Sequence, residues 1–307
     1  MSRENQSVVT EFIFQGLSSQ PRMQTVLFLV FLVCYLLTVL GNTLITAVIR
    51  ADCQLHSPMY FFLANLAFLD ICYVSSYIPQ MLVNLLTKKR TISFSSCAAQ
   101  MYFSLAFGIT ECVLLGVMAY DRYMAICHPL LYAAVINRKA SIHAVVASWI
   151  SGFLSSMIIN SLTLQLPFCR HRVLNHYFCE VQAVLALACA DTALMELVIF
   201  IISILVLFIP FLLIVISYVS ILSTVLKLQS TGVRYKTFST CGSHLMLVTI
   251  YYGTGICIYM TPTSRPPQDR DKVIALFYTI VAPLLNPLIY SLRNKDMKLA
   301  LRRAMNR

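Results

Sequence analysis

The amino-acid sequence predicts an all-α membrane protein, a bundle of seven transmembrane helices followed by a short amphipathic helix. Its 307 residues are 59% hydrophobic and only 11% charged, with a mean hydropathy of +0.77, whereas soluble domains are about a quarter charged. Seven stretches reach the roughly 20 apolar residues that a membrane-spanning helix needs. A β-barrel would instead need short alternating strands.

The seven predicted spans follow one another along the chain. Five contain no Asp, Glu, Lys or Arg: residues 23–49, 140–168, 197–226, 237–264 and 273–292. Two contain a single acid: residues 57–87 contain Asp70, and residues 91–120 contain Glu111. The first 22 residues are polar and lack the apolar core of a signal peptide, so we expect the first span to act as the targeting signal.

The connecting segments predict the orientation. We expect residues 1–22 to be extracellular, residues 23–292 to form the transmembrane domain, and residues 293–307 to be cytoplasmic. Lys and Arg then exceed the acids more strongly on the cytoplasmic side, in line with the positive-inside rule. Asn5 begins an Asn-Gln-Ser glycosylation sequon, which also favours an external N-terminus. The net charge of +11 indicates contact with anionic membrane lipid, and nothing indicates nucleic acid.

The C-terminal segment predicts a helix that lies on the inner leaflet. Its apolar residues recur at helical spacing: Met297, Ala300, Leu301, Ala304 and Met305. Its basic residues occupy the rest of the surface: Lys295, Lys298, Arg302 and Arg303. A basic amphipathic helix of this kind binds at the membrane surface.

The predicted external side holds four cysteines: Cys97, Cys169, Cys179 and Cys189. Three of them lie in the long loop of residues 168–196, which predicts an ordered loop. Disulfides persist outside the cell, and four cysteines allow three connectivities. The alternative is a zinc or copper site, with which oxidation competes; its ligands would be Cys169, His171, His176 and Cys179.

Three charged groups in or at the predicted spans need an explanation. Asp70 and Glu111 would repel each other if both were ionised and buried together, so either one is protonated or a cation binds between them. Arg122 ends the third apolar stretch, where an arginine must pair, extend to the interface or face the bundle interior. The adjacent Asp121 is the partner that the sequence offers.

Six stretches together resemble odorant receptors of the tetrapod (class II) group, within the rhodopsin-like (class A) G-protein-coupled receptors. They are LHSPMYFFLANLAFLD (55–70), MAYDRYMAICHPLLY (118–132), HYFCE (176–180), SY (217–218), KTFSTCGSH (236–244) and PLLNPLIYSLRNKD (283–296). The resemblance covers nearly the whole chain. Most rhodopsin-like receptors have a tryptophan–proline motif in the sixth span. This sequence has Tyr251-Tyr252-Gly253 there instead, and that replacement is typical of odorant receptors.

The resemblance implies a receptor of the plasma membrane, in olfactory cilia, with no catalytic residues and no resident cofactor. It implies that a small odorant activates a heterotrimeric stimulatory, olfactory-type G protein and raises cAMP. The implied coupling and switch residues are Asp121, Arg122, Tyr123, Tyr218 and Tyr290. The implied disulfides are Cys97–Cys179 and Cys169–Cys189. A sodium ion near Asp70 and Glu111, with Asn42 and Asn286 beside them, is implied as well, and a protonated pair without an ion remains the alternative.

The resemblance also implies where the odorant binds. The expected lining residues are Met101, Ser104, Leu105, Gly108, Ile109, Ile202, Ser203, Val206, Gly255, Ile256, Tyr259, Tyr278 and Thr279. None is charged, and Ser104 stands where amine receptors carry an aspartate. Apolar contact with a few hydroxyls suits a small neutral volatile such as a ketone, alcohol, ester or terpenoid. Because small ligands gain at most about 1.5 kcal/mol per heavy atom, we expect weak binding.

Two other classes of protein deserve comparison. A transporter or channel would explain Asp70 and Glu111 as parts of an ion path, but the seven spans show no obvious inverted repeat. A membrane-embedded hydrolase would need a motif such as HExxH or GxSxG, and the sequence has neither. The receptor is the leading hypothesis, and it is not an enzyme.

Overall fold

A computed structural model describes residues 9–168, 172–227, 231–260, 269–293 and 295–305. Only the backbone is described for residues 231, 233–240, 243, 290–293, 295 and 304–305. Asn5, Cys169 and His171 of the sequence analysis therefore lie outside the described residues, as do the side chains of Tyr290, Lys295, Ala304 and Met305.

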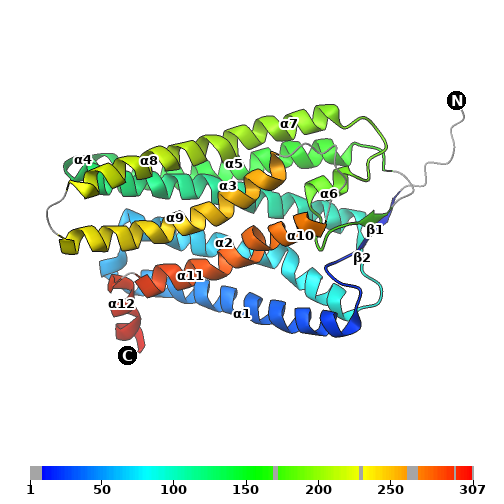
Figure 1. The fold of residues 1–307 in the computed structure, drawn as a ribbon, viewed down its shortest axis with the longest axis horizontal. Coiled ribbons are helices and arrows are strands. Elements are labelled where there is room, and N and C mark those ends of the chain that lie inside the picture. Colours follow the sequence, from blue (N-terminus) through cyan, green and yellow to red (C-terminus); the bar gives the residue numbers. More distant parts are fainter. Residues whose placement is uncertain (1–8, 169–171, 228–230, 261–268, 294, 306–307) are drawn as a thin grey trace, which may run out of the picture.

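The predicted helical bundle is confirmed, with long helices running side by side (Figure 1). Five of the long helices are uninterrupted: α1 (Pro21–Ala51), α2 (Pro58–Leu86), α3 (Phe94–Cys127), α5 (Arg138–Leu164) and α9 (Thr231–Tyr259). Two further spans are composite: α7 (Ala193–Ser203), η2 (Ile204–Phe208) and α8 (Ile209–Leu226), then α10 (Asp269–Leu276), η3 (Phe277–Val281) and α11 (Ala282–Arg293). By length and composition, six helices among the described residues can cross a membrane, and α9 contains a shorter apolar segment, His244–Tyr259.

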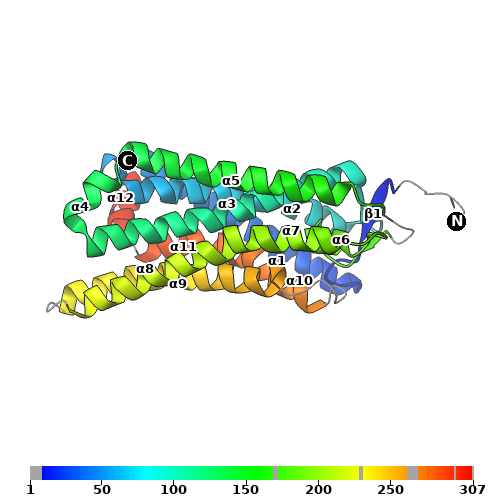
Figure 2. The ribbon, with the colours of Figure 1, turned by 90° about the horizontal axis from the view of Figure 1, so that it is seen from above.

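Short elements occupy the two ends of the bundle (Figures 1 and 2). One end carries η1 (Cys53–Leu55), α4 (Pro129–Val135) and α12 (Lys295–Met305); we call it the α12 end. The other carries α6 (Val181–Leu185) and three strands: β1 (Glu11–Phe14), β2 (Thr91–Ser93) and β3 (Val173–Leu174). We call it the lid end.

The three strands form a small sheet that the sequence analysis did not predict. Their order is β2-β1-β3, with β1 antiparallel to β2 and parallel to β3. The inward residues of β1, Phe12 and Phe14, are buried, and the Phe12 ring meets the rings of Phe94 and Phe168 at centroid distances of 5.9 Å. The sheet therefore joins the N-terminal segment to the loop that follows α5.

Helix α3 lies at the centre of the bundle and packs against α2, α5 and α8. Its closest approach is to α5 at Gly152, where an added Cβ would overlap the hydroxyl of Thr110 and lie 2.5 Å from the carbonyl oxygen of Ala106. Small residues allow membrane helices to approach in this way.

The two composite spans each contain one π-helical turn just before a proline. η2 precedes Pro210 and η3 precedes Pro283. Because proline has no backbone N–H, it interrupts the regular i→i−4 hydrogen bonding, and π turns are frequent at functional sites. In the last span, η3 therefore marks a departure from regular α-helix just before Pro283.

Helix α12 has the predicted amphipathic pattern, but part of its apolar face packs on the bundle rather than facing outward. Met297 and Ala300 are buried in the main hydrophobic core, and Leu301 packs against it. Arg303 pairs with Asp52 at the end of α1, at 2.8 Å. The helix is therefore attached to the protein by both apolar contact and charge.

Candidate functional site

A cavity of about 70 Å³ lies among α2, α3, α5, α7, η2, α9 and η3, below the loop that follows α5. Most of the expected ligand-binding residues line it: Met101, Ser104, Leu105, Gly108, Ile109, Ile202, Ser203, Val206, Tyr259 and Tyr278. Ligand pockets usually measure about 300–1,000 Å³. This cavity therefore suits a compact molecule, and a larger one would require side chains to move. Contact with an odorant stays a prediction.

Three expected residues are not among those that line the cavity: Gly255, Ile256 and Thr279. Gly255 lies against Leu207, whose Cδ1 would be 3.2 Å from an added Cβ. Thr279 is fully buried. Its hydroxyl donates to the carbonyl of Ala275 at 2.7 Å and meets the Tyr177 hydroxyl at 2.9 Å. Thr279 therefore holds the loop rather than facing the cavity.

Sequence reasoning missed several lining residues: Tyr73, Cys112, Ile159, Phe178, Cys179, Glu180, Val181, Ile199, Leu207 and Tyr251. Four of these, residues 178–181, belong to the loop. Their sequence signal was the HYFCE stretch itself, because a Cys97–Cys179 bond brings the neighbours of Cys179 over the start of α3. The expectation of an uncharged lining is corrected here, since Glu180 is an acid.

Glu180 is buried and caps the short helix α6. Its Oε2 accepts hydrogen bonds from the backbone N–H groups of Gln182 at 2.7 Å and Ala183 at 3.0 Å. Its Oε1 makes no hydrogen bond of normal geometry with the described residues, although the Tyr259 hydroxyl is close enough to favour the charged form. Burial raises the pKa of Glu180 to about 7, against the lowering effect of the Ala183 and Gln182 N–H groups. Both protonation states are therefore populated near neutral pH.

Tyrosine hydroxyls supply other polar atoms near the cavity. Tyr251 donates to the carbonyl oxygen of Gly108 at 3.0 Å, which ties α9 to α3. The Tyr278 hydroxyl is buried and makes no hydrogen bond of normal geometry with the described residues, although the Tyr259 hydroxyl lies close to it. A buried polar group without a partner is costly, so a ligand that bonds to it gains affinity.

The loop above the cavity is fixed at several points. The backbone N–H of Cys179 donates to Gln100 Oε1 at 2.8 Å, and Gln182 Nε2 donates to the carbonyl of Ile258 at 3.0 Å. His176 is buried between the rings of Tyr177 and Phe178. Burial, followed by the positive charge of Lys272, lowers the pKa of His176 to about 3, so this imidazole is neutral.

The disulfide between Cys97 and Cys179 is confirmed, with the Cα atoms 5.5 Å apart. Cys189 is also disulfide-bonded, but its expected partner, Cys169, lies outside the described residues. Because Cys179 is engaged in a disulfide, its sulfur is not a thiolate that could ligate zinc or copper. Among the described residues, no three His, Cys, Asp or Glu side chains form a group that could hold a metal.

Asp70 and Glu111 lie in the core, both nearly inaccessible to solvent. Asn286 Nδ2 donates to both carboxylate oxygens of Asp70, at 2.8 and 3.1 Å. Glu111 Oε2 is buried with no hydrogen-bond partner of normal geometry among the described residues. Asn42 instead donates to the carbonyl oxygens of Thr38 at 3.1 Å and Pro283 at 3.4 Å. The structure thus brings Asp70 and Asn286 into contact, and it places Tyr251 and Asn286 close to the Glu111 carboxyl without a hydrogen bond of normal geometry to Oε2.

The expected ion pair between Asp121 and Arg122 is not formed within the part of the chain that the structure describes. Asp121 is buried, and its Oδ1 accepts a hydrogen bond from Tyr132 of α4 at 2.7 Å. Adjacent residues on a helix do not face each other, which explains the difference. Arg122 lies within electrostatic reach of Cys241 and His244 in α9.

The remaining switch residues connect elements at the same end. Tyr123 bonds to His128 Nε2 at 2.9 Å. Tyr218 of α8 bonds to His244 Nδ1 of α9 at 2.7 Å. The residues that the sequence analysis assigned to coupling therefore gather at the α12 end, where α3, α8 and α9 meet, with the Tyr290 side chain outside the described residues.

This bundle, with a small cavity near the lid end and a polar cluster at the other end, defines a seven-helix membrane receptor of the G-protein-coupled class. A family model described as olfactory receptor matches residues 31–307. Human olfactory receptor 2G3 is 50% identical over 100% of this chain and 99% of its own length. Human olfactory receptor 5A2 is 50% identical over 99% of this chain and 94% of its own length. Mouse olfactory receptor 2B6 is 46% identical over 100% of this chain and 98% of its own length. The chain belongs to the olfactory receptor family, whose members are receptors and not enzymes.

Proposed function

We propose that this olfactory receptor binds a small neutral volatile in the cavity described above and activates a stimulatory, olfactory-type G protein, which raises cAMP. The observation that carries the proposal is the course of α3. This helix lines the cavity with five expected residues, from Met101 to Ile109, and bears Arg122 near its other end. One rigid element thus connects a ligand site to a coupling site.

The cavity lining supports the ligand class. Aliphatic side chains and aromatic rings surround a few hydroxyls, among them Ser104, Ser203 and Tyr278. Glu180 adds a carboxyl group that donates a hydrogen bond when protonated and accepts when ionised. A compact ketone, ester or alcohol would bond to one of these groups and bury the rest of its surface.

The chemistry of the two ends supports one orientation of the chain. The lid end holds the Cys97–Cys179 disulfide, and disulfides persist outside the cytosol. The α12 end holds a basic helix, which suits the anionic cytoplasmic leaflet. We therefore place the lid end outside the cell and the receptor in the plasma membrane. An epitope tag at the N-terminus should be accessible to antibody on intact cells, and a tag after residue 307 should not.

The Asp70–Glu111 pair would tune the balance between inactive and active forms, through either a shared proton or a sodium ion. The buried Oε2 of Glu111 could take up a proton or bind an ion, but Asn286 already donates to both oxygens of Asp70. The two alternatives differ in one measurable way. Replacing sodium by potassium should change basal signalling only if an ion is held, and Glu111→Gln should remove that dependence.

The test is cAMP accumulation in cells that express the chain with the olfactory G protein and receive a panel of ketones, alcohols, esters and aliphatic amines. A response to a neutral member, lost in Arg122→Ala at unchanged surface expression, supports the proposal. A response to amines alone would refute the neutral ligand class. If the protein were instead a transporter, Arg122→Ala should have little effect on ion flux and Asp70→Asn a large one.

A further inference from the structure

A second cavity of about 710 Å³ lies at the α12 end, on the outside of the bundle between α1, η1, α2 and α5. It is far larger than the cavity below the loop, and its lining includes none of the coupling residues Asp121, Arg122, Tyr123 and Tyr218. Its apolar wall includes Phe61, Phe68 and Ile142, which are all exposed on the surface of the protein. In a membrane such a wall faces acyl chains.

The other wall of this cavity is polar and positively charged. Arg50 lies in the last turn of α1, and Arg138 begins α5; both line the cavity, together with His56. Both arginines are exposed, and neither makes an ion pair or hydrogen bond with the residues that the structure describes. None of the lining residues is an Asp or Glu. Two guanidinium groups therefore face one cavity without a counter-charge from its walls.

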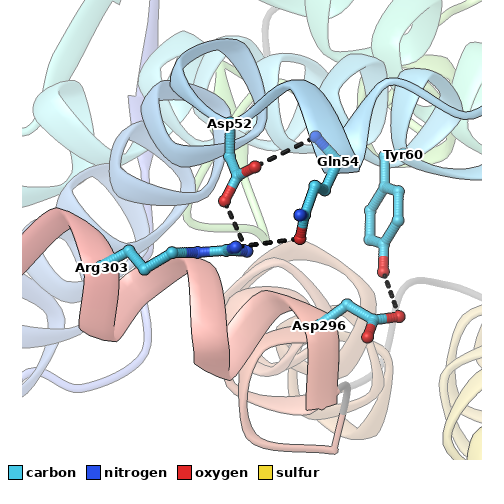
Figure 3. A network of polar contacts seen from close by, with 5 residues as sticks. All are labelled: Asp52, Gln54, Tyr60, Asp296 and Arg303. Carbon is cyan, nitrogen blue, oxygen red and sulfur yellow. Dashed lines mark hydrogen bonds and ion pairs between the residues drawn. The ribbon is translucent and has the colours of Figure 1, made fainter.

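The nearest acid along the chain is already engaged, as Figure 3 shows. Asp52 Oδ2 pairs with Arg303 of α12 at 2.8 Å, while its Oδ1 accepts from the Gln54 backbone at 3.0 Å. Arg303 also donates to Gln54 Oε1 at 2.9 Å. This network fixes η1, whose last residue, Leu55, lies in the cavity wall. The negative charge of Asp52 is neutralised by Arg303. The charges of Arg50 and Arg138 are therefore left for a ligand.

We propose that this second cavity, a groove on the outside of the bundle, binds one anionic phospholipid. The phosphate would lie at Arg50 and Arg138, and an acyl chain would lie along Phe61 and Phe68. Guanidinium groups match phosphate oxygens in geometry and charge. A soluble anion would leave the apolar wall uncovered, and a sterol would bring one hydroxyl to two cations. The α12 end faces the cytosol in the orientation proposed above, which makes the lipid one of the inner leaflet.

The test uses the purified full-length receptor and native mass spectrometry with dioleoyl-phosphatidylserine and dioleoyl-phosphatidylcholine. We expect several-fold more bound phosphatidylserine than phosphatidylcholine, and loss of this preference in Arg50→Gln/Arg138→Gln. Lys139→Gln is the control, because it removes one positive charge from the helix that carries Arg138, at a residue that does not line the cavity. An equal preference in the double variant and the wild type would overturn the proposal, as would an equal loss in Lys139→Gln.

A second measurement locates the bound lipid directly. Phosphatidylserine with a photoreactive acyl chain, incorporated into membranes that contain the wild-type receptor, should label peptides from residues 58–68 and 138–142. Labelling confined to other helices would refute the groove as the site. If cholesterol at equal amounts removes this labelling while the Arg50→Gln/Arg138→Gln variant retains it, the occupant is a sterol and the proposal fails.

Discussion

The hydroxyl of Tyr218 and the imidazole of His244 form a 2.7 Å hydrogen bond that joins α8 to α9 beside Arg122. Both side chains are buried, and the rings are stacked with their centroids 5.7 Å apart. In the coupling proposed above, a G protein needs space at this end of the bundle. The bond holds together two helices whose separation would provide that space. It is thus positioned to favour the closed arrangement.

We expect Tyr218→Phe to raise basal cAMP, since it removes the bond and preserves the ring. A hydrogen bond of this kind is worth about 1 kcal/mol, which corresponds to roughly a five-fold change in the balance of two states. His244→Phe should have a similar effect, and the double variant should exceed neither single variant by much. Additive effects, or lower basal signalling at equal surface expression, would show that the bond does not restrain the closed form.

The pH dependence of the odorant response should depend on Glu180. Its pKa of about 7 means that the carboxyl becomes protonated as the pH falls from 8 to 6. A ketone needs a donor, so its potency should rise over that interval, by about five-fold for one hydrogen bond. Glu180→Gln donates at every pH and should show a flat response at the high-potency level. Dose–response curves at pH 6, 7 and 8 measure this.

The control for this prediction is Asp191→Asn, which neutralises an exposed acid of the same loop that does not line the cavity. It should keep the pH dependence of the wild type. If the curves of Glu180→Gln shift with pH as strongly as those of the wild type, another group governs the response.

The helical spans and the Cys97–Cys179 disulfide could be predicted because their signals are local or rest on well-matched motifs. The strand β1 could not. Its alternating Phe12 and Phe14 are a strand signal, but its partners lie about 80 and 160 residues away along the chain, and pairing over such separations leaves no local trace. Glu180 was missed for a related reason, since its place in the cavity depends on how the loop folds after the disulfide forms.

The same contrast applies to the coupling end. Motif resemblance identified Arg122 and Tyr218, but not their contacts. Tyr132 competes for Asp121 from α4, and His244 reaches Tyr218 from α9. These contacts are set by the packing of separate helices.

The stability of the lid end should depend on pH through His176 and Glu180 in opposite directions. The folded-state pKa of His176 is about 3, below its unfolded value, so its contribution to stability is lost as the pH falls below about 6.5. The raised pKa of Glu180 has the opposite effect, because protonation from pH 7 downward favours the folded form. The two effects partly cancel in the wild type.

The contribution of His176 should therefore be visible in the Glu180→Gln background. Between pH 6.5 and 5, we expect this variant to lose roughly 2 kcal/mol of stability, from about 1.4 kcal/mol per pH unit for one proton. Adding His176→Gln should remove the loss. Thermal unfolding of the purified receptor at pH 7.5, 6.5 and 5 provides the measurement, and an unchanged slope in the double variant would contradict the assignment.

The contact of α3 with α5 should make Gly152 intolerant of any side chain. A Cβ at this position would overlap the Thr110 hydroxyl and lie 2.5 Å from the Ala106 carbonyl oxygen. Backbone atoms of a central helix cannot move aside cheaply, and overpacking costs about 1–3 kcal/mol or more. Gly152→Ala should therefore reduce surface expression and lower the unfolding temperature of the purified receptor.

Gly253 in α9 provides the matched control, because an added Cβ there meets nothing within 4 Å. Replacing this glycine by alanine adds helix propensity, worth up to about 1 kcal/mol in a helix interior. Gly253→Ala should leave surface expression unchanged or raise it slightly. The comparison is matched because both variants add one methyl group to a membrane helix. Equal loss of expression in the two variants would mean that the methyl group acts through a general effect on insertion, whereas loss in Gly152→Ala alone locates the effect at the contact between α3 and α5.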